Sequence, residues 1–196
     1  MAKVLDSACA NAFRSCKVKY VPTGTPTAPS RAISTDGVPP TAATRSIKLW
    51  DLKEIIDYMK KDLLVPPYDG ENYICIATTS FLRQLMDDPE WQDAAKYGDP
   101  ERLFSGEVGR IYRTRCVEET NVLTTYLGTT VHKGEAIFFG ADPVVEGVVI
   151  PEEIRAKIPE DYGRSKGVAW YYMGGWNVTW DTGAPGEAKI VHVTST

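Results

Sequence analysis

Residues that often carry catalysis are few in this chain of 196 residues. It contains only two histidines, His132 and His192, which excludes a histidine-rich metal site. His192 falls in a strand-like run and His132 lies beside a lysine, so we expect both to be structural or exposed. Neighbouring carboxylates occur at 87–88 and 118–119. A glycosidase needs two carboxylates that face one bond, and adjacency in the sequence does not create that geometry.

Other sequence patterns give no better enzyme signal. Residues 106–109, Gly-Glu-Val-Gly, lack the third glycine and the following helix of a dinucleotide-binding loop. No Ser–His or Cys–His pattern indicates an activated nucleophile. Two of the four cysteines, Cys75 and Cys116, lie in strand-like runs, where a small reduced core residue is a better interpretation than a disulfide or metal ligand. We therefore predict a chain that is not an enzyme and that has no cofactor and no metal.

An aromatic cluster near the C-terminus is the strongest signal for ligand binding. It comprises Trp170, Tyr171, Tyr172, Trp176 and Trp180. Carbohydrate-binding β-modules stack sugars on such rings, which makes a non-enzymatic binding module the alternative function. The even spacing of Trp170 with Tyr172 and of Trp176 with Trp180 instead favours core-facing strand positions. A coplanar, exposed trio of rings would favour sugar binding.

Composition narrows the possible partners. The net charge is −4 and the chain has no clustered run of Lys and Arg, which disfavours tight, sequence-independent binding of nucleic acid. No apolar stretch approaches the ~20 residues of a membrane span, and we expect no signal peptide. Hydrophobic residues at 43% and charged residues at 24% are ordinary for a globular chain that can bury a core.

The pattern of the first 70 residues predicts two helices around a loop. Residues 2–17 place apolar side chains on one stripe of a helix. Residues 22–45 are rich in Pro, Thr and Ser, which is typical of a loop. Residues 51–62 form the clearest helix, with Asp51 as the expected N-cap of a capping box and Ile56 on its buried stripe.

The remaining sequence predicts mostly strands. We expect strands at 73–77, with Ile76 buried, and at 110–117, separated by a helix that begins near Ser80. Further strands are expected at 135–139 and 144–150.

Two further elements are expected near the C-terminus. Residues 151–157, which begin with proline, predict one or two helical turns. The alternating runs 168–181 and 188–194 predict a long antiparallel hairpin.

The order of motifs between residues 71 and 123 resembles the major capsid proteins of tailed phages. The motifs are the strand at 73–77, the helix at 80–85, a Trp-bearing segment that ends in Tyr97, and the segments 106–110 and 117–120. The match is nearest to the N-four-like family within the Hong Kong 97-type fold. It covers roughly residues 46–150, and no single motif is specific by itself.

The resemblance implies an α+β chain with a peripheral and an axial domain. Residues 1–70 would supply a truncated spine helix, a Pro/Thr-rich loop and the capped helix of the peripheral domain. Residues 71–164 would form the axial domain, and 165–196 a hairpin that returns to the peripheral domain. In this fold an N-terminal arm and an extended loop precede the spine helix. The chain begins inside that helix, so either both segments are absent or the match is partial.

The resemblance also implies a function. Many identical subunits, arranged in hexamers and pentamers, would build the icosahedral shell of a phage head. The shell would enclose DNA without binding it specifically, and scaffolding, decoration and portal proteins would be further partners. Assembly would occur in the cytoplasm of the bacterial host, and the final location would be the virion. The alternative is an aromatic-rich binding or decoration module of a virion.

Charges of both signs in the segment 83–115 would suit contacts between identical subunits. The predicted interface residues are Arg83, Asp87, Asp88, Glu101, Arg102, Arg110, Arg113 and Arg115. A solvated face is the competing interpretation for each of them.

Overall fold

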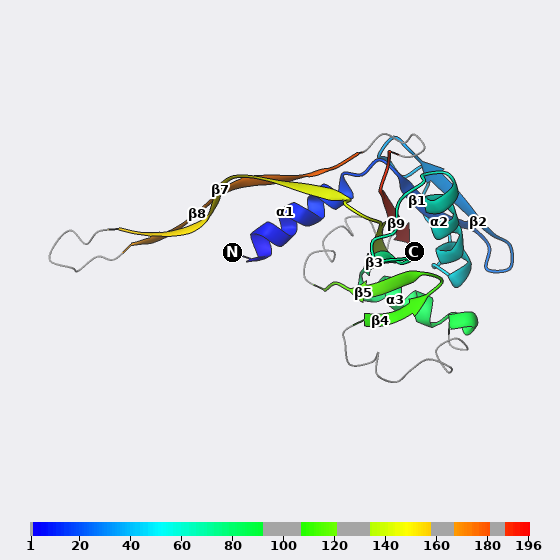
Figure 1. The fold of residues 1–196 in the computed structure, drawn as a ribbon. Coiled ribbons are helices and arrows are strands. Elements are labelled where there is room, and N and C mark those ends of the chain that lie inside the picture. The colour runs from blue at the N-terminus through cyan, green and yellow to red at the C-terminus, as the bar shows by residue number, and fades with distance from the viewer. Residues whose placement is uncertain (1, 92–106, 121–133, 158–166, 181–186) are drawn as a thin grey trace.

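The chain folds into a body and a long two-stranded arm that projects from it (Figure 1). A computed structural model describes residues 2–91, 107–120, 134–157, 167–180 and 187–196. The helices are α1 (Ala2–Arg14), α2 (Leu49–Lys61) and α3 (Thr79–Met86). The strands are β1 (Lys19–Gly24), β2 (Pro29–Ser34), β3 (Tyr73–Ala77), β4 (Glu107–Ile111), β5 (Thr114–Glu118), β6 (Gly134–Phe139), β7 (Val144–Ala156), β8 (Val168–Val178) and β9 (Ile190–Ser195).

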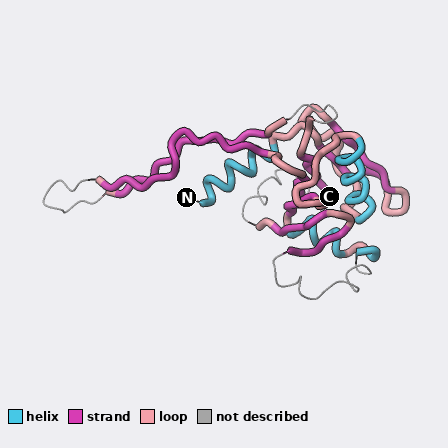
Figure 2. The backbone as a smooth tube through the Cα atoms, viewed as in Figure 1, coloured by secondary structure: helices cyan, strands magenta, loops and turns pink. Residues whose placement is uncertain are grey.

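A seven-stranded mixed sheet forms the centre of the body (Figure 2). Its strand order is β2-β1-β9-β6-β3-β5-β4. The β1–β9 and β3–β5 pairs are parallel, and the other pairs are antiparallel. The sheet takes strands from all three segments 1–70, 71–164 and 165–196, so distant parts of the sequence share one core.

The main core lies between this sheet and the helices α2 and α3. On α2, Leu52, Ile55, Ile56 and Met59 are at most 1% exposed, as expected for a stripe at helical spacing. The predicted helix and the burial of Ile56 are therefore confirmed. The cap differs from the prediction, because Lys48 is the N-cap and Asp51 is the third helical residue.

The opposite face of the sheet has a smaller core. Phe13 of α1 packs there with Ile137 and Phe139, and Val144 and Val178 at the base of the arm join them. Ile76, expected to be largely buried, is half-buried on this face. It lines a surface pocket beneath α1, because the helix covers only part of the face.

Several sequence predictions of local structure are wrong. The expected strand 110–117 is a β4–β5 hairpin, with positive φ at Tyr112 (47°) and Arg113 (60°) in its turn. The expected loop 22–45 contains the end of β1 and all of β2. Residues 151–156, expected to be helical, continue β7.

The predicted C-terminal hairpin is also wrong. β8 pairs antiparallel with β7, and β9 inserts between β1 and β6 in the body. Alternation shows that a segment is a strand, but it does not identify the partner strand. Pairing β8 with β7 leaves these two strands as a separate ribbon outside the seven-stranded sheet.

Candidate assembly surfaces

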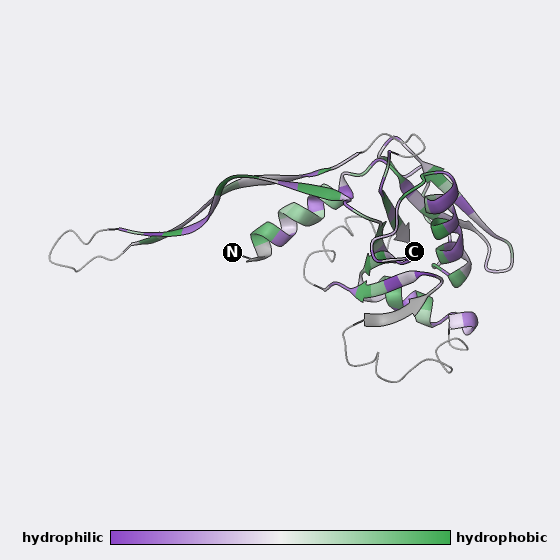
Figure 3. Cartoon of the chain, viewed as in Figure 1, coloured by the Kyte–Doolittle hydropathy of each residue, from purple (hydrophilic) through white to green (hydrophobic). Residues whose placement is uncertain are grey.

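The arm formed by β7 and β8 is the most exposed apolar part of the described chain. An isolated two-stranded ribbon is marginally stable in water, and large exposed apolar patches usually mark interaction sites. Figure 3 shows hydrophobic residues along the arm well outside the body. The exposed apolar side chains of the arm, with their exposed fractions, are Val145 (54%), Val148 (51%), Val149 (74%), Ile154 (75%), Val168 (74%), Tyr171 (47%) and Met173 (56%).

Three rings of the predicted aromatic cluster stack on one face of β8. The ring centroids of Trp170 and Tyr172 are 5.8 Å apart with an interplanar angle of 17°, and those of Tyr172 and Trp176 are 5.7 Å apart at 22°. Tyr172 leans over Gly174, where a Cβ atom would lie 2.3 Å from its hydroxyl oxygen. The glycine therefore makes room for the stack.

The stack differs from both sequence interpretations. These rings lie on the arm and are half-buried, so the prediction that they face the core is wrong. Nearly parallel rings at these distances are stacked with their faces against one another, and are not spread out as a coplanar platform. A sugar-binding site needs free ring faces, so the geometry favours a role in stiffening the arm.

A hydrogen bond links the stack to β7. The Tyr172 hydroxyl donates to the Glu146 carboxylate at 2.8 Å. Loss of solvation and the neighbouring Glu146 carboxylate raise the pKa of Tyr172 to about 12. The phenol therefore stays protonated and keeps donating to Glu146 across the neutral range.

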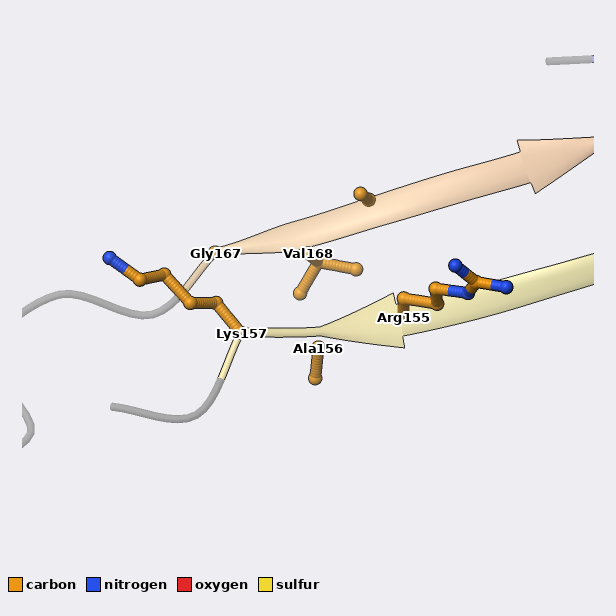
Figure 4. Close-up of a pocket in the computed structure, with 6 residues that line it drawn as sticks. Arg155, Ala156, Lys157, Gly167 and Val168 are labelled. Carbon is orange, nitrogen blue, oxygen red and sulfur yellow. The ribbon is translucent and has the colours of Figure 1, made fainter. Parts of the chain in front are cut away.

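The outer end of the described arm carries basic side chains. Figure 4 shows Arg155 and Lys157 on β7 and the loop that follows it, with Val168 at the start of β8 beside them. Arg155 forms an ion pair with Glu153, and its guanidinium lies 4.5 Å from the centroid of the Tyr171 ring. Such contacts order long side chains on a surface and leave their charge accessible.

A buried polar cluster fixes the end of α1 to the sheet. The Arg14 guanidinium donates two hydrogen bonds, of 2.8 and 3.0 Å, to the carboxylate of Glu135 on β6. His192 of β9 contacts the same carboxylate through Nε2 at 2.8 Å. The Lys19 ammonium lies 3.3 Å from His192 Nδ1 and donates to the Arg14 carbonyl at 2.7 Å. The cluster connects α1, β1, β6 and β9, so it locks the helix beside the arm onto the body.

Hydrogen-bond roles define the protonation state of this cluster. An ammonium group can only donate, so Nδ1 of His192 accepts from Lys19, and Nε2 carries the proton that it donates to Glu135. Burial, with the nearby charges of Lys19 and Arg14, lowers the pKa of His192. Burial opposes ionisation of Glu135, but the hydrogen bonds and charges of His192 and Arg14 outweigh it and lower the pKa of that carboxyl group. The ground state is therefore a neutral imidazole beside an ionised carboxylate.

Three predicted interface charges lie at the end of α3. Arg83 and Asp87 are exposed. Asp88 is half-buried, and its carboxylate accepts the backbone N–H of Leu49 at 2.8 Å and that of Glu90 at 3.3 Å. Because Asp88 anchors the start of α2, part of its hydrogen-bonding capacity is already used within the chain.

Three more of the predicted interface residues lie on the β4–β5 hairpin. Arg113 pairs with Glu71 at 3.2 Å and Arg115 with Asp69 at 3.3 Å, and all four side chains are at least 40% exposed. Arg110 belongs to β4, where it is the register partner of Arg115. Glu101 and Arg102 lie outside the described residues. The contact of this set with a neighbouring subunit stays a prediction.

Two kinds of feature are absent from the described residues. Among them, no group of three or more His, Cys, Asp or Glu side chains is arranged to hold a metal ion. No helix in the described ranges is long and apolar enough to cross a membrane.

Known proteins were compared with this chain by sequence and by structure. No family model and no curated protein sequence matches the chain. Among solved structures, that of Mycobacterium phage Che8 is similar over 98% of this chain and 58% of its own, with a TM-score of 0.59 and 15% identity. The chain has a phage-capsid fold. The head structure of Helicobacter pylori bacteriophage KHP40 covers 78% of this chain and 59% of its own, with a TM-score of 0.57 and 14% identity.

The phage-capsid fold agrees with the resemblance seen in the sequence. The capsid of Ralstonia phage GP4 has a TM-score of 0.52 and 19% identity, and it matches 79% of this chain and 49% of its own. The chain thus spans about half to three fifths of the length of these capsid chains. The α+β class is confirmed, and the similarity lies in structure rather than sequence.

The arm and the buried cluster are absent from the sequence predictions. An uncharged run at 168–178 that contains paired glycines was a signal for an exposed ribbon, because a core strand rarely carries two adjacent glycines. Glu135 and His192 are 57 positions apart, and no local pattern indicates that they touch.

Proposed function

We propose that this chain is a major capsid protein, a structural subunit whose copies assemble into the icosahedral head shell of a tailed phage. The observation that carries the proposal is the phage-capsid fold over 98% of the chain. The exposed apolar arm supports it, because a subunit with neighbours on several sides would cover such a surface in the particle. The proposed role is structural and not enzymatic.

The finer assignment is the N-four-like family of the Hong Kong 97-type fold. We propose that the body and the arm correspond to the axial and peripheral parts of that fold, with α1 as the end of the spine helix. Hexamers and pentamers of identical subunits would place the charges on α3 and the β4–β5 hairpin next to neighbouring copies. Scaffolding, decoration and portal proteins are the further partners proposed, DNA would be enclosed without a specific site, and assembly would precede release from the host cytoplasm.

Electron microscopy of the purified chain tests this proposal. A shell subunit is expected to form rings, sheets or closed particles at high concentration, because heterologous contacts close into rings or continue. Arg83→Glu and Arg113→Glu would reverse two of the proposed contact charges, and Arg31→Glu on β2 serves as a control at a charge outside the predicted set. A chain that remains monomeric at every concentration and salt condition contradicts the proposal.

The second candidate is a decoration or binding module of a virion, for which the exposed apolar side chains of the arm would provide the binding surface. A decoration module would bind to preformed particles and would not assemble alone. Adding the chain to heads that lack it separates the two functions: saturable binding without self-assembly supports the module, and self-assembly supports the subunit.

A further inference from the structure

The two edges of the arm are protected to very different degrees. β7 carries Pro151, four charged residues and two register shifts in its pairing with β8. The charged residues of β7 are Glu146, Glu152, Glu153 and Arg155. Proline, charges and bulges are the features by which natural sheets prevent another strand from pairing at an exposed edge.

β8 has none of these protective charges or prolines. Its eleven residues, Val168–Val178, include neither a charged side chain nor a proline. In the described part of the chain the ribbon contains only β7 and β8, so the second edge of β8 has no partner strand. α1 runs beside the inner part of the arm and ends before the outer part (Figure 1). No described strand therefore pairs with the outer part of β8, where Val168, Tyr171 and Met173 are exposed.

We propose that β8 of one copy pairs antiparallel with β8 of a second copy, giving a four-stranded sheet in the order β7-β8-β8-β7. Antiparallel pairing of identical strands has two-fold symmetry, so each copy offers the same surface. The contact would satisfy the open backbone groups of both edges and convert two marginal ribbons into one sheet of sufficient width.

Charge selects β8 of a second copy as the occupant. Pairing of an uncharged strand with itself brings no like charges opposite one another, whereas β7 against β7 would bring its glutamates close together. A partner strand with many charged side chains would find no opposite charge on β8 with which to form an ion pair. This pairing rests on the proposed function, which supplies a second copy as the partner. The pairing adds which strand of each copy makes the contact.

Cysteine cross-linking tests the pairing directly. Ala169, Tyr171 and Met173 lie on the face of β8 opposite the aromatic stack, so each can be replaced by cysteine without touching the stacked rings. We expect a disulfide-linked dimer at whichever position lies nearest the two-fold axis, with weaker cross-linking at its neighbours. Val145→Cys on β7, of similar exposure to Met173, is the control and should not cross-link. The unmodified chain is run alongside, since its Cys9 is half-buried.

A pair of matched lysine variants provides a second measurement. Met173→Lys would put a charge on each of the two paired β8 strands, which are otherwise uncharged, and we expect self-association in sedimentation to weaken by about tenfold or more. Val145→Lys adds the same charge on β7 at almost the same exposure, 54% against 56%, and should leave association unchanged. Thermal melting of both variants monitors the body, which neither substitution touches.

Each outcome supports or overturns the pairing. Equal weakening by both lysines, cross-linking at Val145 as strongly as on β8, or no dimer at any β8 position overturns it. A cross-link within one chain also overturns it, because a segment of the same chain would then cover the edge. Shells that form without a β8 cross-link overturn the pairing and leave the proposed function intact. A β8-linked dimer that never forms rings or shells supports the pairing and contradicts the shell function.

Discussion

The body and the arm are stabilised in different ways. In the body, Tyr20, Ile55 and Phe138 are completely buried between a seven-stranded sheet and its helices. In the arm, Val149 and Ile154 are about three quarters exposed, and the ribbon is supported by its stacked rings and by contacts of its base with the smaller core. The body is thus stabilised by a buried core of its own, whereas the arm keeps an apolar surface that suits contact with other chains.

The largest effect is expected at the junction of the two regions. Glu135→Gln would leave the buried Arg14 guanidinium without its carboxylate, and breaking a buried ion pair typically costs about 3–5 kcal/mol of unfolding free energy. Glu153→Gln on the arm also breaks an ion pair with an arginine, but both side chains are exposed and the cost should be about 0–1 kcal/mol. Chemical denaturation measures both. Equal losses would show that the junction is no more important than a surface pair.

Truncation of one isoleucine in the body and one in the arm compares the packing of the two regions. Ile56→Ala in the body should lower the unfolding free energy by about 2–5 kcal/mol, because it leaves a cavity in a close-packed interior. Ile154→Ala on the arm, where the side chain is 75% exposed, should change it by less than about 0.5 kcal/mol. Thermal or denaturant melts of the dilute chain provide the measurement. A large effect at Ile154 would mean that the arm is part of the cooperative core.

Acid should affect the junction before the rest of the body. The pKa of His192 is lowered by folding, so the unfolded chain binds a proton first as the pH falls below about 6.5, and stability declines. The pKa of Glu135 is also lowered, so its contribution is present above about 4.5 and is lost as the pH falls further. Denaturation as a function of pH should show both declines, and His192→Gln should remove the first. Stability that is flat between pH 7 and 5 would contradict the neutral-imidazole assignment.

Disruption of the ring stack in the arm is expected to have a small, local effect. Gly174→Ala would place a Cβ atom 2.3 Å from the Tyr172 hydroxyl oxygen and break the stack, at a local cost of about 0.5–1.5 kcal/mol. Gly175→Ala is the matched control, since no heavy atom lies within 4 Å of its added Cβ. Near-ultraviolet circular dichroism should change for the first variant only, with little change in the melting of the body. An unchanged spectrum for Gly174→Ala would show that the rings do not form a fixed stack.

Local patterns in the sequence predicted the three helices α1, α2 and α3 and several of the strands. The stripe on α2 and the strand at 73–77 follow from spacing alone, because a helix or strand must bury one face. A proline at the start of a run does not always mark a helix. Pro89 does begin a helical segment, whereas Pro151 lies inside an exposed edge strand, where a missing N–H costs little.

Strand partners and the buried cluster could not be predicted in this way. Alternation in 168–178 and 188–194 fits a hairpin, but β9 instead completes the sheet of the body, where all six of its residues are buried. The contact of Arg14 with Glu135 joins residues 121 positions apart. The sequence gives the sign of each charged side chain at 83–115. It does not show which residues of the same chain they pair with, as Arg115 pairs with Asp69.

The position of β9 has a consequence for the timing of folding. The β2–β1 pair and the β6–β3–β5–β4 group are joined only through this strand, and the chain supplies it after all the others. A nascent chain can form either group on the ribosome, but it cannot close the sheet until β9 has emerged. Pairings between such distant segments form slowly, because the loop must close before the contacts stabilise it. Closure of the seven-stranded sheet must therefore wait until the residues of β9 have been translated.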